Sequence, residues 1–339
     1  MTSRFLSIIA LSVCIGQSIA ADAGKISIVI LDGRNNHDWK TTTASLKATL
    51  EATGRFDVHV ATAPEDKAEP PPKRTKVEDG AYLDAKKKYD DLVKSLRPAM
   101  DAEWAKWTVD FSKCRAVVLN YNGADWPKPM QQAFVEFVRG GGGVMLVHAA
   151  NNAFGNWAEF NDMIGLGWRK GGFGVCLTID PAMGKAVECC KDDASGHGAK
   201  HPFVVTNRVP DHPVLRGMPA EWMHGKDELY HHVRGPAQNV TILASAFSDE
   251  KQRGSGRHEP VLWEVAYGKG RVLVCTMGHH WLGDTESESL ECVGFQNVFA
   301  RGVEYVASGA VTLPLPAMLP SKANQSLLAP ASVAWHSKK

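Results

Sequence analysis

Apolar segments that suit buried β-strands alternate along this chain with segments that suit helices, and this alternation constrains the fold most. Residues 26–31 come first, and a strand formed by them is apolar on both faces, as the central strands of parallel sheets are. The alternation predicts an α/β fold with a doubly wound, mostly parallel sheet, helices on both faces and added hairpin excursions. Further strands are predicted at residues 56–60, 115–120, 144–147, 241–247, 261–266 and 271–275, and helices at about 41–53, 130–139 and 297–306.

One α/β domain is expected over residues 21–310. A helical insertion is expected at about 73–108, because residues 82–107 combine helical spacing with many lysines. Residues 311–339 contain repeated prolines and are expected to form an extended C-terminal tail.

The first 20 residues have the pattern of a secretory signal peptide. Arg4 precedes an apolar run over residues 5–16, and the small residues Ser18 and Ala20 fit a cleavage site. A short membrane anchor is the alternative, but the run is too short to span a bilayer comfortably, and no later segment is long and apolar enough. We therefore expect an exported protein, periplasmic or extracellular, without a membrane span after cleavage.

The charge balance argues against one class of partner. Thirty-eight Lys and Arg residues against 37 Asp and Glu residues give a formal charge of +1, so no global field attracts nucleic acid. The sequence also shows no nucleic-acid-binding motif, and it leaves the oligomeric state open.

Export permits disulfide bonds. Cys176 lies on one side of a predicted turn centred near Met183, and Cys189 and Cys190 lie on the other side. A cross-strand bridge from Cys176 to Cys189 or to Cys190 is expected, and the sequence does not choose between them.

Polar and aromatic side chains follow four of the predicted strands. The carboxyl ends of parallel strands meet at one edge of the sheet, where ligands bind. Amides and carboxylates bond hydroxyl groups and tryptophan rings stack on sugar rings, so this set predicts a site for a polyhydroxylated ligand. The alternative is that loops are polar wherever they occur. The residues predicted to bind substrate at this edge are Asp32, Asn36, Asn122, Trp126, Asn151 and His280.

Six short motifs occur in an order and spacing that resemble the ThuA-like (trehalose-utilisation) family. The resemblance spans roughly residues 26–308 and implies a flavodoxin-like, class I glutamine amidotransferase-like fold. That fold carries a catalytic cysteine at a strand-to-helix elbow. Here the elbow begins with His148, so glutamine amidotransferase activity is not expected. The motifs are Gly141–Val144 leading into His148–Ala150, Asp211–Val214, Asp227–Tyr230, His258–Trp263, Gly268–Val272 and Thr276–His280.

The resemblance also implies a carbohydrate-processing enzyme that acts on a 3-keto-glycoside or disaccharide. A carboxylate paired with a histidine supports hydrolysis, elimination or isomerisation by proton transfer. The predicted catalytic residues are Glu228, His37, His148 and His279, and the predicted substrate contacts beside Glu228 are Asp227 and Tyr230.

Two other functions remain open. A non-catalytic sugar-binding module would use the same loops without an acid and a base. A metal-dependent hydrolase would use the same three histidines and Glu228 as ligands, since imidazole and carboxylate groups suit divalent cations. No short histidine spacing supports a metal site, so the cofactor is unknown at this stage and a divalent metal is the one candidate.

Overall fold

A computed structural model describes residues 24–65 and 80–335. The expected signal peptide at residues 1–20 lies outside this range, and so do residues 73–79 of the expected insertion.

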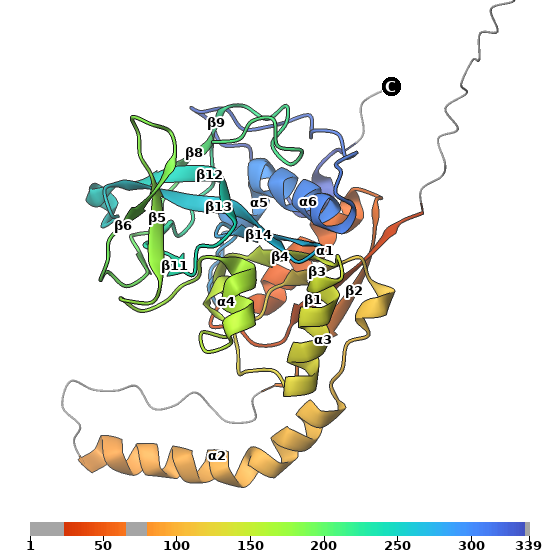
Figure 1. The fold of residues 1–339 in the computed structure, drawn as a ribbon, viewed down its shortest axis with the longest axis vertical. Coiled ribbons are helices and arrows are strands. Elements are labelled where there is room, and N and C mark those ends of the chain that lie inside the picture. Colours follow the sequence, from red (N-terminus) through yellow and green to blue (C-terminus); the bar gives the residue numbers. More distant parts are fainter. Residues whose placement is uncertain (1–23, 66–79, 336–339) are drawn as a thin grey trace, which may run out of the picture.

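A twelve-stranded sheet forms the centre of the described chain (Figure 1). Its main path runs β2-β1-β3-β4-β14-β13-β12-β8-β9, and β5 pairs with β13 and carries β6 and β11. The strands of the main path are β2 (Phe56–Thr62), β1 (Ile26–Asp32), β3 (Ala116–Leu119), β4 (Gly143–Val147), β14 (Gly270–Cys275), β13 (Arg257–Tyr267), β12 (Val240–Ser248), β8 (Val204–Asn207) and β9 (Glu221–Met223). The other strands are β5 (Val175–Ile179), β6 (Ala186–Cys189) and β11 (Arg234–Gly235), and the separate pair β7 (Gly196–His197) and β10 (Tyr230–His231).

The sheet is parallel in one half and antiparallel in the other, which corrects the prediction of a mostly parallel sheet. The neighbours β2, β1, β3, β4 and β14 run parallel, whereas β14, β13, β12, β8 and β9 pair antiparallel. The direction changes at the tight turn between β13 and β14, which is too short for the crossover that parallel neighbours need. Gly268 in this turn has φ +60°, and a Cβ there would lie 2.9 Å from backbone atoms of Arg139.

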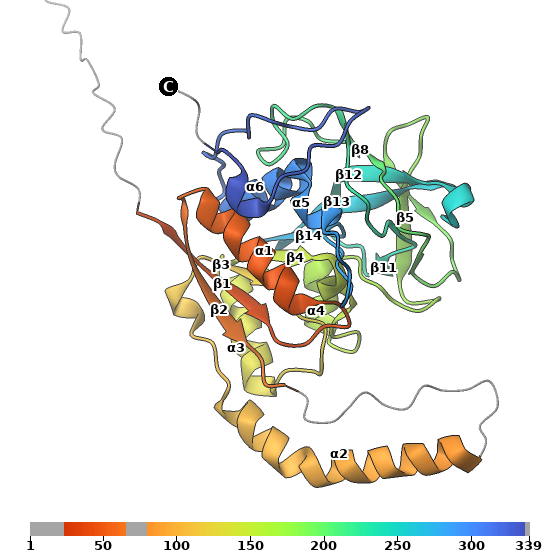
Figure 2. The same cartoon turned by 180° about the vertical axis from the view of Figure 1, so that it is seen from behind.

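Helices cover both faces of the sheet (Figures 1 and 2). On one face α1 and α6 pack against the sheet through residues such as Leu46 and Phe299. On the other face α3 and α4 contribute Phe134 and Phe160 to a second core. The mixed α/β class predicted from the sequence is confirmed. The helices are α1 (Trp39–Ala52), α2 (Gly80–Lys106), α3 (Lys128–Arg139), α4 (Ala158–Ile164), α5 (Glu288–Glu291) and α6 (Val293–Ser308), with short 3₁₀ helices η1 (Phe111–Lys113), η2 (His148–Asn152), η3 (Glu250–Gln252) and η4 (Pro330–Ser332).

Helix α2 lies where the insertion is expected. None of its residues is buried, and Figure 1 shows it projecting away from the sheet. Its many charged residues suit this exposed position.

The described part of the C-terminal tail packs against the domain instead of extending from it. Leu328 donates a backbone hydrogen bond to Glu291, and η4 lies against α1. Val333 and Trp335 are 5% and 1% exposed. The prolines exclude long helices and strands from this segment, but its apolar side chains still pack against the domain.

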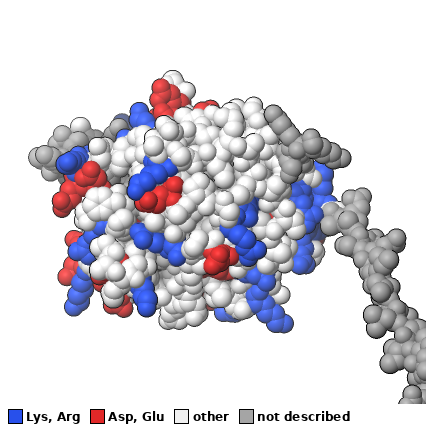
Figure 3. Space-filling model, turned by 90° about the horizontal axis from the view of Figure 1, so that it is seen from above, with Lys and Arg blue, Asp and Glu red and all other residues white. Residues whose placement is uncertain are grey.

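Acidic and basic side chains are interspersed over the face seen in Figure 3, between wide uncharged areas. Among the described residues, no helix has the length and apolar character needed to cross a membrane.

Trp335→Ala tests whether the tail is part of the core. Removing a buried tryptophan loses apolar burial and leaves a cavity, so we expect a loss of about 3–5 kcal/mol in the free energy of unfolding. Met318 belongs to the same tail but is 59% exposed, and Met318→Ala should change stability by less than about 0.5 kcal/mol. Denaturant unfolding measures both, and equal small effects would contradict the packed tail.

Candidate functional site

Three strand ends in the parallel half bring three histidines to one edge of the sheet. His37 follows β1, His148 follows β4 and His279 follows β14, while Glu228 joins them from the segment before β10. One ligand atom from each of the four side chains lies within 4.8 Å of the others, and all four residues are buried. The structure therefore brings together the four residues that the sequence predicts as catalytic, here called the histidine–glutamate cluster.

His148 occupies a strained elbow directly after β4. Its φ of +45° is a conformation that costs a non-glycine residue on the order of 1–3 kcal/mol. Nδ1 lies 2.6 Å from the carbonyl oxygen of Thr276, so Nδ1 carries the proton and donates. Nε2 is left with its lone pair, and the hydroxyl of Tyr230 donates to it at 2.9 Å.

Asparagine side chains orient His37. Its Nδ1 lies 3.2 Å from Oδ1 of Asn35 and 3.1 Å from Oδ1 of Asn36. Asn122 donates to the same Oδ1 of Asn36 at 2.8 Å, which identifies this atom as the acceptor. Nδ1 of His37 is therefore the donor, and the nitrogen left for the cluster is Nε2, which is buried without a hydrogen-bond partner. Trp281 stacks on the ring with centroids 4.2 Å apart.

The carboxylate of Glu228 lies close to one tryptophan and three histidines. Its Oε1 accepts the indole N–H of Trp281 at 3.1 Å and lies 3.2 Å from Nε2 of His279. Nε2 of His197 is 3.6 Å from the same oxygen, and Nε2 of His148 is 3.8 Å from Oε2.

Asp227 positions the loop that carries His279. It is fully buried, and its Oδ2 accepts from Nε2 of His224 at 2.7 Å and from the backbone N–H of Gly278 at 2.8 Å. Its Oδ1 accepts from the backbone N–H of His279 at 3.3 Å. These bonds occupy the carboxylate, so Asp227 orients the cluster where the sequence predicted a substrate contact.

At neutral pH the carboxylate of Glu228 is ionised, and the imidazoles of His37 and His279 are neutral. Burial, followed by the proximity of His148, lowers the pKa of His37 to about 2 and that of His279 to about 4. Burial by itself raises the pKa of Glu228, but its surrounding histidines, His148 first among them, outweigh burial and keep that pKa below its usual value. Burial raises the pKa of Tyr230 well above its usual value, so the phenol keeps its proton.

The residues at the rim of the cluster were missed by sequence reasoning. The side chain of His197 is 34% exposed, against 3% for Glu228, and Trp168 packs against the rings of His197 and Tyr230. Both rim residues lie in the glycine-rich excursion after α4, where no periodic pattern marks them. Trp281 lies beside the predicted His279, and only its position after β14 could have signalled it.

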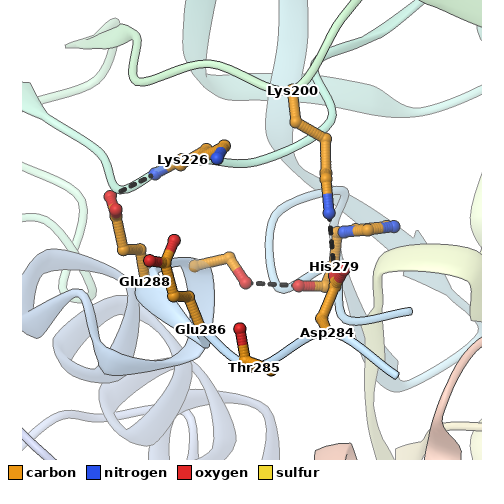
Figure 4. A pocket seen from close by; sticks show the side chains of 8 residues that line it. Lys200, Lys226, His279, Asp284, Thr285, Glu286 and Glu288 are labelled. Carbon is orange, nitrogen blue, oxygen red and sulfur yellow. Dashed lines mark hydrogen bonds and ion pairs between the residues drawn. The ribbon is translucent and has the colours of Figure 1, made fainter. Parts of the chain in front are cut away.

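One pocket borders the cluster, and a second lies beside the loop that carries His37. The first, of about 250 Å³, is lined by His279 and by charged residues of both signs, including Lys200, Lys226 and Asp284 (Figure 4). Lys200 bonds Asp284 at 2.8 Å, so this positive charge is already paired.

The second pocket, of about 420 Å³, lies at the loop after β1. Asn35, Asn36, Asn122 and Trp39 line it. Amide groups around an indole ring suit a sugar ring, and two of these amides also orient His37.

Four predicted substrate contacts lie outside the cluster. Asp32 is buried and accepts a hydrogen bond from a threonine of α1. Trp126 is 2% exposed and packs against Phe154 with centroids 4.9 Å apart, so its ring is part of the core and has no face free for a sugar. His280 pairs with a serine before α5, and the buried amide of Asn151 has no hydrogen-bond partner.

The structure has one of the two disulfide pairings that the sequence left open. Cys176 on β5 is joined to Cys190, with Cα atoms 6.2 Å apart. Cys189 is the register partner of Cys176 across β5 and β6 but remains a thiol.

The motif residue Glu259 lies on β13, apart from the cluster. Its carboxyl accepts from the hydroxyl of Ser255 at 2.6 Å and from the backbone N–H of His232 at 3.1 Å. Burial raises its pKa to about 7. Glu259 thus fixes the segment after β10.

The fold and the site together define an α/β protein with a buried histidine–glutamate centre at the carboxyl edge of its sheet. The family described as ThuA, trehalose utilisation, matches residues 99–306. The chain belongs to this family, which confirms the resemblance seen in its motifs and gives it a carbohydrate-related role at the level of the family.

One solved structure supports the assignment, and a second shares the fold. A ThuA-like protein from Parabacteroides merdae is 33% identical, with a TM-score of 0.76 and coverage of 91% of this chain and 99% of that chain. A ThuA-like protein from Bacteroides uniformis is 16% identical, with a TM-score of 0.51 and coverage of 86% and 95%, and shows the fold alone. No curated protein matches the chain.

Glu259→Gln tests the buried carboxyl. Its pKa rises from 4.5 to about 7 on folding, so its contribution to stability is complete below pH 4.5 and is lost as the pH rises through 7. Between pH 4.5 and 8 we expect the free energy of unfolding of the wild type to fall by about 2–3 kcal/mol more than that of the variant. Denaturant titrations at the two pH values measure this difference, and parallel changes would show that the pKa is not raised. Glu136→Gln, on the exposed side of α3, should follow the wild type.

Proposed function

We propose that this protein is an exported carbohydrate-processing enzyme that acts on a 3-keto-glycoside or disaccharide by acid–base chemistry. The observation that carries the proposal is the ionised carboxylate of Glu228, buried beside neutral imidazoles and the protonated hydroxyl of Tyr230. Such a set provides one proton acceptor and one hydrogen-bond donor away from bulk water.

The chemistry needs no nucleophile. A keto group at C3 of a sugar acidifies the hydrogen on C2, and Glu228 takes that proton. The electron pair left on C2 forms the C1–C2 double bond as the bond from C1 to the glycosidic oxygen breaks, and the proton on Glu228 passes to the leaving oxygen. Tyr230 donates a hydrogen bond to the keto oxygen as negative charge develops there. Addition of water to the double bond completes hydrolysis. If the glycosidic bond stays intact instead, the proton returns to the other face of C2 and the result is isomerisation.

The pocket after β1 suits the remainder of the substrate. Its amides Asn36 and Asn122 and the ring of Trp39 lie next to the loop that carries His37. A second sugar ring bound there would place the glycosidic bond toward the cluster, which is the placement a disaccharide requires.

The finer fold assignment belongs to the same proposal. The strand order β2-β1-β3-β4-β14 agrees with the flavodoxin-like order and supports a class I glutamine amidotransferase-like domain. The elbow position at which that fold has a cysteine carries His148 here. Export rests on the first 20 residues, whose pattern is that of a signal peptide.

Glu228→Gln tests the catalytic assignment. The glutamine side chain has the size of glutamate but cannot take a proton, so kcat/KM on 3-keto-disaccharides should fall by about 10²–10⁴-fold. The mature protein and the variant are incubated with oxidised and ordinary disaccharides, and mass spectrometry follows the products. Glu51→Gln, on the exposed face of α1, should retain full activity.

Two outcomes would contradict the proposal. Normal turnover by Glu228→Gln would show that the carboxylate is not the base. Saturable binding of sugars by the wild type without any product would identify a sugar-binding module.

A further inference from the structure

We propose that the histidine–glutamate cluster binds one divalent first-row transition-metal cation, of the Zn²⁺ type, through Nε2 of each histidine and the carboxylate of Glu228. The ligands come from three strand ends and from the segment before β10, so no short sequence spacing reveals them. The proposal stands on the placement of the rings, on their free nitrogens and on the groups that orient them.

The three imidazoles have the mutual placement of metal ligands. The ring centroids of His37, His148 and His279 are 4.9, 5.0 and 5.2 Å apart, and the rings are inclined at 89°, 89° and 75°. Three imidazoles that bind one Zn²⁺ at about 2.0–2.1 Å in tetrahedral geometry have centroids about 5 Å apart. Ordinary ring packing has no need to bring three imidazoles into such an even triangle.

The fourth ligand completes the set at short range. Oε1 of Glu228 is 3.2 Å from Nε2 of His279, and Oε2 is 3.8 Å from Nε2 of His148. Neighbouring ligand atoms around a tetrahedral Zn²⁺ are about 3.3 Å apart, so small side-chain rotations are enough to close the shell.

Two of the three Nε2 atoms make no hydrogen bond. Nε2 of His37 is buried without a partner, and Nε2 of His279 is buried with only the 3.2 Å contact to Oε1 of Glu228. Most buried polar atoms in proteins make a hydrogen bond. A bound ion is one explanation for a buried polar atom that makes none. The hydrogen-bond partner of Nε2 of His148 is the hydroxyl of Tyr230, which can rotate and leave this lone pair to a ligand.

The opposite ring nitrogens of two of the histidines, His148 and His37, are held as in metal sites. Nδ1 of His148 donates to the carbonyl of Thr276, and Nδ1 of His37 donates to the amide oxygens of Asn35 and Asn36. Metal-binding histidines almost always donate their second N–H to a carbonyl or carboxylate, because this bond sets the tautomer and raises the basicity of the ligand.

The other sets of candidate ligands among the described residues are less suitable. One consists of Cys176, Cys189 and Cys190, and the other of Cys190, Asp193 and His232. Both include Cys190, which forms the disulfide with Cys176 and so has no thiolate to offer a metal ion.

The proposal is independent of the sugar chemistry. A cation bound by one oxygen of Glu228 leaves the other oxygen for a proton, and it would also polarise a keto oxygen of the substrate. If the protein binds no metal, the acid–base proposal still stands. If it binds metal but processes no sugar, only the acid–base proposal falls.

The test is metal binding by the full mature chain. After removal of metal with a chelator, the protein is titrated with Zn²⁺ by calorimetry and its metal content is measured after dialysis. We expect one equivalent of Zn²⁺ and a raised midpoint of thermal unfolding. Co²⁺ should give visible bands without the thiolate charge-transfer absorption that cysteine ligands produce.

Variants locate the site. His37→Ala and His279→Ala should each weaken Zn²⁺ binding by at least about 100-fold, and Asn36→Ala, which removes only a partner of His37, by about 10–100-fold. His59→Ala, on the exposed strand β2, and His201→Ala, outside the cluster, should bind as the wild type does. Circular dichroism of the metal-free proteins shows whether each variant is folded. If a ligand variant does not fold, the Zn²⁺ affinity of Asn36→Ala tests the site instead.

The proposal is overturned if the wild type binds neither Zn²⁺ nor Co²⁺ at micromolar concentration. It is also overturned if the folded His37→Ala and His279→Ala variants bind with unchanged affinity, or if the Co²⁺ spectrum shows thiolate ligands.

Discussion

The hydrogen bond from Nδ1 of His148 to the carbonyl oxygen of Thr276, 2.6 Å long, is the interaction on which the rest of the site depends. It joins the residue after β4 to the residue after β14, which are neighbours in the parallel half of the sheet. The bond fixes the tautomer, so Nε2 is the nitrogen that remains for Tyr230 and Glu228. The positive φ of His148 places its ring at the strand end. The packing of the surrounding sheet offsets the backbone strain of this conformation.

Burial gives this arrangement its chemical character. The cluster keeps two imidazole nitrogens without hydrogen-bond partners, and each such group costs about 1–3 kcal/mol of stability. The same burial makes His37 and His279 neutral, while their neighbour Glu228 stays ionised. Asp227 fixes the loop after β14 through backbone N–H groups. The unpaired imidazole nitrogens around one carboxylate thus lower the stability of the fold. Such a local loss of stability is typical of a functional centre.

The sequence predicted those parts of the fold and site that follow from periodicity and from strand ends. Apolar runs located β1, β3, β4 and β14, and the rule that parallel strands end at one edge located His37, His148 and His279. Hairpin excursions were predicted, but not that half of the sheet is antiparallel, because a strand's own pattern does not state the direction of its neighbour. His197 lies in an irregular excursion without a pattern, and Trp126 was wrongly placed at the ligand because a tryptophan after a strand fits a core as well as a binding face. The tail was expected to be extended because of its prolines. The sequence does not show that Trp335 is buried.

The orientation of the imidazoles is the central claim, and long-range ¹H–¹⁵N NMR of the histidine side chains tests it most directly. The spectra distinguish the two neutral tautomers from the charged ring for each assigned histidine. We expect the Nδ1–H tautomer for both His37 and His148 in the metal-free protein at neutral pH, with Nε2 unprotonated. A proton on Nε2 of either ring would contradict it, because that nitrogen would no longer offer a lone pair to the cluster.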